Sequence, residues 1–225
     1  MSIALAFDVY GTLFDLSSVE RRIGEAVGKN AREISEMWRS KQLEYSFRRA
    51  LMRQYQDFSV CSYQALEYAL DRYGCKLPEE GRRKIAAAQS SLPLFPDVVP
   101  ALEDLTGSEC SIHALSNGAR KSVQSLLEGA GIERFFDGVV SAEAVSSFKP
   151  DPAVYAHFLE ETGSARESTW LVSGNPFDLI GALSFGMKAI WIRRSEDQLF
   201  DPWGIGPTLT VESLTEIPDA LSGFL

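Results

Sequence analysis

The sequence predicts an α/β protein in which a parallel sheet is interrupted by a helical insertion, and two observations indicate this class. Short apolar runs that end on a small or polar residue alternate with helical stretches at the start of the chain and again from about residue 96. Between Asp15 and Pro96 the pattern is helical, without intervening strands. We therefore expect a Rossmann-like α/β core made of residues 1–15 and 96–225 and an inserted helical cap domain made of residues 16–95.

The predicted strands are short and apolar, as in a sheet buried on both faces. They cover residues 4–7, 112–115, 138–140, 169–172, 187–192 and 208–211. Predicted helices follow three of them, over residues 119–128, 152–162 and 176–185, and stop before Gly131, Gly163 and Gly186. This alternation favours a parallel sheet with helices on both faces.

Bulk composition narrows the class of function. A chain of 225 residues with 45% hydrophobic residues can bury a core, and its formal net charge of −9 argues against a nucleic-acid or anionic-membrane surface. We find no basic leader and no apolar run near the roughly 20 residues that span a bilayer. We therefore expect a cytoplasmic protein that acts on a small molecule.

Cysteine and histidine content leaves few metal or redox sites. Cys61, Cys75 and Cys110 are odd in number and lack a CxxC spacing, so we expect reduced thiols rather than disulfides or a zinc site. His113 and His157 are the only histidines, which leaves little room for a Ser-His-Asp triad.

The stretch FDVYGTLFD places a carboxylate, Asp8, where the first apolar strand ends. In open parallel sheets ligands bind beyond the carboxyl ends of the strands, so we expect Asp8, Ser116, Lys149 and Ser173 to converge on one crevice. A carboxylate at such a position can attack carbon or phosphorus and form a covalent ester. The alternative is that Asp8 only caps the following turn.

Two further segments offer groups that bind anions. Ser116 and Asn117 precede a predicted helix, where free backbone N–H groups bind anions, although both residues are also ordinary N-caps. Asp151 and its neighbouring prolines predict a helix start that fixes the direction of Lys149. A cation near Asp8 would keep that carboxylate ionised and hold an anionic substrate, whereas the alternative is a surface lysine.

The segment SGNPFDLIGA predicts another helix start, with Asp178 in its first turn. There Asp178 could act as a base that activates water. Alternatively, Asp178 could reach back to the helix start as an imperfect capping box.

These elements together resemble the haloacid dehalogenase superfamily across the whole chain. The motifs that carry the resemblance are DVYGT at Asp8, LSN at Ser116, KP at Lys149 and SGNPFD at Ser173. The sequence is similar in particular to the L-2-haloacid dehalogenases (type II), and MWRSKQLEYSF is a further match. Many superfamily members are magnesium-dependent phosphatases with a DxDx[TV] first motif and a GDxxxD fourth motif.

This chain departs from the phosphatase pattern at two positions. Tyr10 replaces the second Asp of the first motif, and its ordinary pKa of about 10 makes it a poor acid for a leaving alkoxide. Gly174 stands where the fourth motif supplies its first acid and offers no side chain to magnesium. A halide leaving group needs no proton, and a haloacid needs no phosphate-neutralising metal. We therefore expect no metal and no cofactor.

Carried over position by position, the resemblance implies that Asp8 is the nucleophile, that Thr12 orients it and that Arg39 receives the departing halide. The polar residues expected to complete the catalytic network are Ser116, Lys149, Tyr155, Ser173, Asn175 and Asp178. The residues expected to bind the substrate or the halide are Tyr10, Arg39, Leu43, Phe58, Ser116, Asn117 and Phe177.

Within these sets the implied roles differ. Ser116 would hold the substrate carboxylate, and Asp178 would position or activate the hydrolytic water. Asn117 and Phe177 would help Arg39 to cradle the halide. The apolar wall around the alkyl part of the substrate would consist of Tyr10, Leu43 and Phe58. Without the resemblance, Arg39 would be interpreted as an exposed helical arginine whose stem covers apolar neighbours.

The resemblance implies hydrolysis of short (S)-2-haloacids to (R)-2-hydroxy acids through an aspartyl ester, with one inversion at C2, and it suggests a homodimer. Two alternatives stay open. One is a phosphatase or another phosphoryl-transfer member of the superfamily. The other is a catalytically idle member that acts as a binding module.

Overall fold

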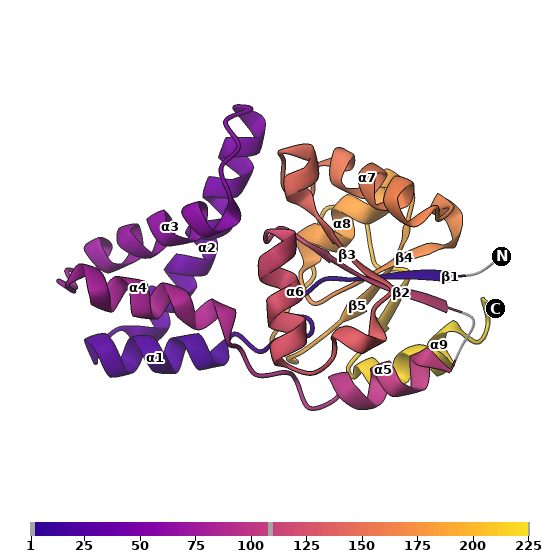
Figure 1. Ribbon diagram of the computed structural model, residues 1–225, viewed down its shortest axis with the longest axis horizontal. Helices are drawn as coiled ribbons and strands as arrows, with labels where there is room; N and C mark the ends of the chain where they lie inside the picture. The colour runs from indigo at the N-terminus through magenta and orange to yellow at the C-terminus, as the bar shows by residue number, and fades with distance from the viewer. Residues whose placement is uncertain (1–2, 108–109, 225) are drawn as a thin grey trace.

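The computed structural model describes residues 3–107 and 110–224. The predicted ranges 1–15 and 96–225 also include residues 1–2, 108–109 and 225, which lie outside the described part. The chain forms two lobes: a sheet covered by helices, and a separate group of helices inserted after the first strand (Figure 1).

The sheet is parallel throughout, as predicted. Its strands in spatial order β3-β2-β1-β4-β5-β6 are Gly138–Ser141, Cys110–Ser116, Ile3–Phe7, Thr169–Ser173, Lys188–Ile192 and Leu209–Val211. Strand β1 lies in the middle, where Phe7 pairs in register with Ala114 of β2 and Val172 of β4. The loops that follow β1, β2 and β4 therefore leave the sheet side by side, at the point where the strand order reverses.

Helices cover both faces of the sheet. One face carries α5 (Val98–Thr106), α6 (Arg120–Gly129) and α9 (Ile217–Leu221). The other face carries α7 (Pro152–Thr162) and α8 (Pro176–Phe185). Short 3-10 helices complete this lobe at Glu133–Phe135, Ala142–Val145, Arg166–Ser168 and Leu214–Glu216.

Local signals set the ends of these helices. Asp151 caps α7 by accepting a hydrogen bond from the Ala153 N–H at 2.9 Å. Gly163 and Gly186 end α7 and α8 in the left-handed region, at φ 67° and 95°. The predicted strands and helices agree with the observed ones to within a few residues, but α5 and α9 were not predicted.

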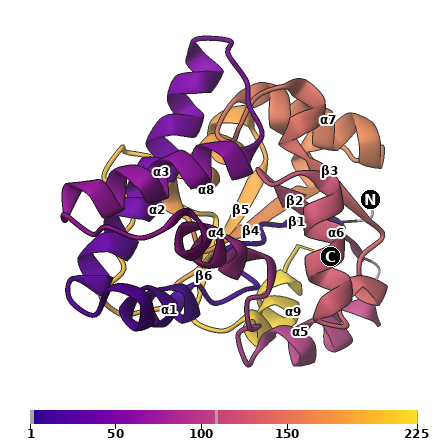
Figure 2. The same cartoon turned by 60° about the vertical axis from the view of Figure 1, so that its left-hand side comes forward.

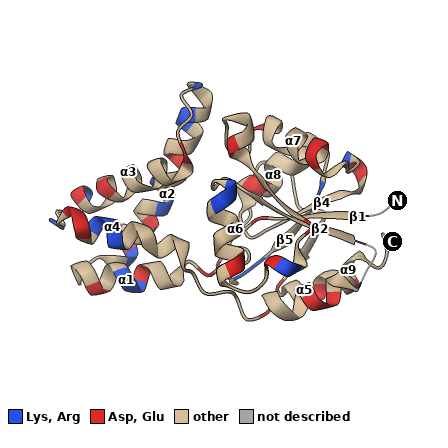
Figure 3. Ribbon diagram, viewed as in Figure 1, with Lys and Arg blue, Asp and Glu red and all other residues tan. Residues whose placement is uncertain are grey.

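The second lobe consists of α1 (Ser17–Val27), α2 (Ala31–Leu51), α3 (Phe58–Arg72), α4 (Glu79–Ala87) and a 3-10 turn at Ala88–Ser90. We call it the helical lobe. Buried polar bonds join its two longest helices: Trp38 Nε1 donates to the Ser62 carbonyl at 2.8 Å, and Gln42 Nε2 donates to Ser62 Oγ at 2.7 Å. Acidic and basic residues both lie along its helices (Figure 3), in part as i,i+4 ion pairs such as Arg83–Glu79.

Two chain segments that run side by side connect the lobes. The Asp15 N–H donates to the Pro93 carbonyl at 2.8 Å, and the Phe95 N–H donates to the Leu13 carbonyl at 3.0 Å. Strand β1 runs toward the helical lobe, so the carboxyl end of the sheet faces that lobe (Figures 1 and 2). None of the helices in residues 3–107 and 110–224 combines the length and the apolar character that a membrane span requires.

Candidate active site

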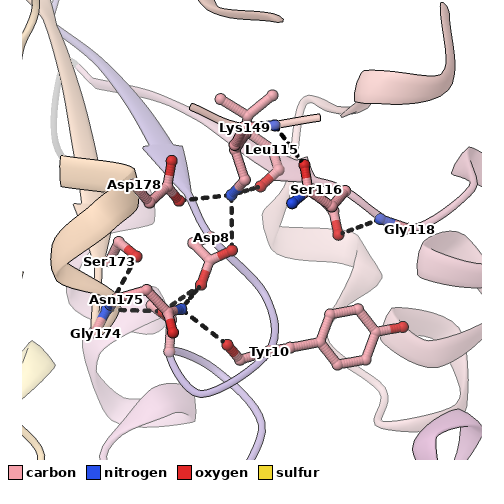
Figure 4. Close-up of polar contacts among 12 residues, drawn as sticks. Asp8, Tyr10, Leu115, Ser116, Gly118, Lys149, Ser173, Gly174, Asn175 and Asp178 are labelled. Atoms are coloured by element: carbon pink, nitrogen blue, oxygen red, sulfur yellow. Dashed lines mark hydrogen bonds and ion pairs between the residues drawn. The ribbon is translucent and has the colours of Figure 1, made fainter. Parts of the chain in front are cut away.

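Asp8 lies directly beyond β1, where the loops after β1, β2 and β4 meet (Figure 4). Its Oδ2 accepts hydrogen bonds from Thr12 Oγ1 at 2.7 Å and from Asn175 Nδ2 at 2.8 Å. Its Oδ1 accepts one from Lys149 Nζ at 2.7 Å. These donors are side chains from three separate loops, so the carboxylate is fixed by the site and does not serve as the cap of its own turn.

Lys149 is buried, with 1% of its surface exposed, and is not a surface lysine. Besides Asp8, its Nζ contacts Asp178 Oδ2 at 2.6 Å and the Leu115 carbonyl at 3.0 Å. An ammonium has three N–H donors, and these three acceptors match them. Burial by itself would lower the pKa of Lys149, but the charges of Asp178 and Asp8 together raise it. Lys149 is therefore a permanent cation between two carboxylates.

Asp178 lies in the first turn of α8, but it does not form a capping box. Its Oδ1 accepts a hydrogen bond from the Tyr155 hydroxyl at 2.9 Å, and its carbonyl lies 3.0 Å from the same hydroxyl. Burial raises the pKa of Asp178 to about 6, although the Lys149 charge acts in the opposite direction. A carboxylate with such a pKa is largely ionised at neutral pH and is a stronger base than an ordinary Asp.

The loop after β4 is tied to the loop after β1. The Gly174 N–H donates to Thr12 Oγ1 at 2.9 Å, and Asn175 Nδ2 also contacts the Tyr10 carbonyl at 3.1 Å. Ser173 Oγ accepts from the Asn175 N–H at 3.0 Å and so shapes the turn that leads into α8. Thr12 and Ser173 thus hold Asp8 and its neighbour Asn175 in place.

Ser116 and Asn117 are not caps of α6, which begins at Arg120 without a side-chain cap. Ser116 Oγ accepts from the Gly118 N–H at 3.1 Å, which leaves the hydroxyl hydrogen to donate to a ligand. Asn117 Oδ1 accepts from the Lys149 N–H at 2.8 Å, which leaves the amide nitrogen as its donor. Both residues border the same small cavity as Asp8.

The helical lobe contributes Arg39 to the site. On α2, its Nη2 donates to Asn175 Oδ1 at 3.1 Å, so the guanidinium reaches across to the sheet lobe. Burial lowers the pKa of Arg39, an effect opposed by the charges of Asp8 and Asp178. One turn further along α2, Leu43 lines the cavity, and two turns further Phe47 contacts Phe177 with ring centres 5.5 Å apart.

A cavity of about 20 Å³ joins these groups. It is lined by Asp8, Tyr10, Arg39, Leu43, Phe58, Ser116, Asn117, Lys149, Asn175 and Phe177. The other residues predicted for the site, Thr12, Tyr155, Ser173 and Asp178, support this lining from behind through the hydrogen bonds above. A volume near 20 Å³ holds about one water molecule, so a larger ligand requires the lobes or side chains to move apart.

A second, wider cavity of about 870 Å³ lies between the helical lobe and the start of α6. It contains none of the charged groups around Asp8, and hydroxyl-bearing residues such as Ser62, Tyr63 and Ser122 contribute to its wall. Tyr10 and Phe58 line both cavities and therefore separate them. Access to Asp8 from the wider cavity leads past these two rings.

The site does not fit a magnesium ion. Tyr10 and Gly174 offer no carboxylate, and Lys149 places a cation on both Asp8 and Asp178. A Cβ at residue 174 would lie 2.5 Å from the Gly11 carbonyl oxygen, so the space for an acidic side chain is filled by backbone. Among the described residues, no group of three or more His, Cys, Asp or Glu side chains could hold a metal.

Two supporting residues were not found from the sequence. Arg194 Nη2 donates to the Thr12 carbonyl at 2.5 Å, and Gln198 Nε2 donates to the Gly174 carbonyl at 2.5 Å. Both follow β5 and support the loops after β1 and β4 from outside the cavity. Neither belongs to a motif, and the only sequence signal was their position after a strand at the same end of the sheet.

Comparisons with known proteins agree with this geometry. A family model described as haloacid dehalogenase-like hydrolase matches residues 4–186. The chain is 37% identical to (S)-2-haloacid dehalogenase 2 of Pseudomonas sp. (strain CBS-3), with 97% of this chain and 95% of that protein covered. It is 34% identical to haloacetate dehalogenase H-2 of Moraxella sp. (strain B), with 95% of each protein covered.

Solved structures show the same architecture. Two structures of the L-2-haloacid dehalogenase from Xanthobacter autotrophicus have a TM-score of 0.93, 32% sequence identity and full coverage of both chains, and one holds covalently bound chloropropionic acid. The chain therefore belongs to the haloacid dehalogenase-like hydrolase family, alongside the L-2-haloacid dehalogenases. The predicted family, fold and enzyme class are confirmed.

Proposed function

We propose that this hydrolase cleaves the carbon–halide bond of short (S)-2-haloacids, with Asp8 as the nucleophile. The observation that carries the proposal is the cavity itself, where the Asp8 carboxylate and the Arg39 guanidinium share one small space with the apolar side chains of Tyr10, Leu43 and Phe58. A nucleophile, an anion receptor and an apolar wall are the three elements that displacement of a halide from carbon requires.

In the proposed first step, Asp8 Oδ1 attacks C2 of the substrate from the side opposite the halogen. A carbon–oxygen bond forms, and the electron pair of the carbon–halogen bond leaves with the halide toward Arg39, Asn117 and Phe177. Ser116 holds the substrate carboxylate, and the Lys149 ammonium offsets the negative charge that this carboxylate brings close to Asp8. We assign the attack to Oδ1 because Oδ2 already accepts two hydrogen bonds, from Thr12 and Asn175.

In the proposed second step, water attacks the ester carbonyl carbon of Asp8. Asp178 takes the proton of this water and returns it to the departing product oxygen. Oδ2 is then the carbonyl oxygen, and the donors Thr12 and Asn175 stabilise the negative charge that develops on it. One inversion at C2 turns an L-2-haloacid into a D-2-hydroxy acid, and a haloacetate into glycolate.

The phosphatase alternative is disfavoured by the group that would have to protonate the leaving alkoxide. Burial, with further contributions from Asp8 and Asp57, raises the pKa of Tyr10 to about 12. At this pKa Tyr10 is a weaker acid than a free tyrosine, and the carboxylic acid of the phosphatase motif is missing. The idle-module alternative is disfavoured by the complete set of hydrogen bonds around Asp8, Lys149 and Asp178.

The direct test is halide release from haloacetates and from each enantiomer of 2-chloropropionate, with and without a chelator. We expect release from the L enantiomer and from the haloacetates, and none from the D enantiomer. Chelation should leave the rate unchanged. Release of phosphate from phosphate esters only when magnesium is added, without halide release, would instead establish the phosphatase.

Assembly, domain limits and location are further proposals. We propose that residues 16–95 form a cap domain, that residues 1–15 and 96–225 form the catalytic core, and that the protein is a cytoplasmic homodimer. The family resemblance supports the homodimer. Sedimentation velocity tests it: a monomer at micromolar concentration would contradict the homodimer.

A further inference from the structure

Helix α8 contains a glycine, Gly181, one turn beyond Asp178. Glycine is a poor residue for a helix interior because it loses more backbone freedom than any other residue on folding. Gly181 is buried and lies in regular helix, so neither a turn nor a positive φ accounts for it. Its lack of a side chain needs another reason.

That reason is the close approach of two neighbours. A Cβ at residue 181 would lie 2.4 Å from the Tyr155 hydroxyl oxygen and 2.5 Å from Pro150 Cβ. Real Cβ atoms do not approach other heavy atoms this closely, so one side must move. Tyr155 has no exposed surface and cannot swing into solvent, and the ring of Pro150 is exposed but rigid, so it moves only if its backbone moves.

Both neighbours belong to the partners of Asp178. The Tyr155 hydroxyl, from α7, donates to Asp178 Oδ1, and Pro150 directly follows Lys149, whose Nζ donates to Asp178 Oδ2. The absence of a side chain at residue 181 lets α7 and the Lys149–Pro150 segment come close to α8. The two hydrogen bonds of the Asp178 carboxylate come from these two segments.

We propose that Gly181 is a positioning residue for the proposed hydrolytic step: its missing side chain admits Tyr155 and Pro150 to the surface of α8 and so sets the contacts of Asp178. This inference rests on the proposed function only where it names the hydrolytic step. The contacts that link Gly181, Tyr155 and Asp178 do not depend on the proposed function.

The substitution Gly181→Ala tests the proposal. The methyl group should push Tyr155 away from Asp178, and the displaced base should slow hydrolysis of the aspartyl ester by about a hundredfold, as small misplacements of catalytic groups do. Ester formation should slow much less, because Asp8 keeps Thr12 and Asn175. Rapid-quench measurements separate the two steps.

The pH profile of ester hydrolysis distinguishes a change in the contacts of Asp178 from a general disturbance of the fold. The Tyr155 hydrogen bond favours the ionised form of Asp178, so its loss should move the acid limb of ester hydrolysis to higher pH. The pKa of Asp178, measured by carbon-13 NMR on aspartate-labelled protein, should rise in the same variant, and this readout requires no activity. An unchanged pH profile and an unchanged Asp178 pKa in Gly181→Ala would overturn the proposal.

Gly129→Ala is the matched control, because Gly129 is the last residue of α6 and a Cβ at this position would meet no neighbouring group within 4 Å. This variant should retain wild-type rates and the wild-type pH profile. A change in Gly129→Ala equal to that in Gly181→Ala would attribute the effect to glycine replacement in general and overturn the assignment.

The double variant Gly181→Ala/Tyr155→Phe covers the case in which Gly181→Ala does not fold. Removal of the hydroxyl removes the closest contact, so Gly181→Ala should lower the unfolding temperature less in the Tyr155→Phe background than in the wild type. If Gly181→Ala lowers the unfolding temperature equally in both backgrounds, or if neither Gly181→Ala nor the double variant folds, Gly181 serves the packing of α8 as a whole and the proposal is overturned. The proposed function is judged separately, by halide release from the wild type.

Discussion

The loop after β4 touches the loop after β1 at two glycines: a Cβ on Gly174 would lie 2.5 Å from the carbonyl oxygen of Gly11. The same contact is reinforced by the hydrogen bond from the Gly174 N–H to Thr12 Oγ1 at 2.9 Å. Backbone therefore occupies the space that an acidic side chain at residue 174 would need, and the departure from the phosphatase motif is a property of the loop packing as well as of one residue.

Introducing an acid at that position should not create a magnesium site. In Gly174→Asp the side chain has no room beside Gly11, and we expect a loss of about 1–3 kcal/mol in the free energy of unfolding from overpacking. Chemical denaturation with and without magnesium measures this loss. Gly206→Asp is the control, because Gly206 has open space around it. Strong stabilisation of Gly174→Asp by magnesium would show that the loops yield and that the steric account is wrong.

The pH dependence of the second chemical step should follow Asp178. Burial, with a smaller contribution from the Asp8 charge, raises its pKa to about 6 in the free enzyme. The Asp8 charge is lost when Asp8 becomes an ester, so in the ester the pKa of Asp178 lies lower, and the base is protonated only below that lower pKa. Ester hydrolysis should be independent of pH above the pKa and should fall roughly tenfold for each pH unit below it. Single-turnover decay of the aspartyl ester at a series of pH values measures this limb. A rate that shows no acid limb down to the pH at which the protein unfolds would rule out Asp178 as the base.

Replacing Arg39 by lysine should affect the first step. The charge stays, but the flat guanidinium with its fixed donors is lost. Loss of one well-placed donor to charge that develops in the transition state costs about 2.7–4 kcal/mol, or roughly a hundred- to thousandfold in the rate of ester formation. Hydrolysis of the ester, after the halide has left, should change little. Rapid-quench kinetics of both steps checks this.

Arg32→Lys provides the comparison for Arg39. Arg32 lies on the same helix but is exposed, with 77% of its side chain accessible, and pairs with Glu36. Its replacement should leave both steps unchanged. If ester formation is as fast in Arg39→Lys as in Arg32→Lys, Arg39 does not stabilise the departing halide and the helical lobe does not contribute to the first step.

The size of the acceptable substrate should depend on Phe58. Phe58 lines both the small cavity at Asp8 and the wider one, so Phe58→Ala should join them. Rates with longer 2-haloacids should then rise relative to 2-chloropropionate, and competition between the two substrates measures the ratio. Tyr63→Ala serves as control because Tyr63 lines the wider cavity and not the small one. An unchanged ratio in Phe58→Ala would place the limit on chain length elsewhere.

The site residues that could be predicted from sequence are those whose position follows from the topology of the parallel sheet. Asp8 and Lys149 are 141 residues apart in the chain, yet their proximity follows from apolar runs that form a parallel sheet and end on polar residues. The same reasoning places Ser116 and Ser173 at this edge. The contribution of Arg39 could not be found in this way, because the orientation of the helical lobe depends on tertiary contacts, and only the family resemblance indicated it.

Other features were beyond sequence reasoning for physical reasons. Helix α9 has only five residues, too few for a periodic pattern, and was missed. Arg194 contacts the Thr12 carbonyl across 182 residues, and a backbone acceptor has no sequence signature. The role of Gly181 likewise appears only when α7 packs on α8, because a glycine in a helical pattern indicates nothing about which neighbour needs the space.

In the proposed mechanism, Asp8 itself forms and loses the ester bond. The most direct test is one turnover of L-2-chloropropionate in heavy-oxygen water with enzyme in excess, followed by mass spectrometry of the peptide that contains Asp8 and of the hydroxy acid, with Asp8→Asn as the inactive control. Attack of water on the ester carbonyl should place one heavy oxygen in Asp8 and none in the product. Heavy oxygen in the product of the first turnover, with Asp8 unlabelled, would mean that water attacks the substrate directly and that Asp8 is not the nucleophile.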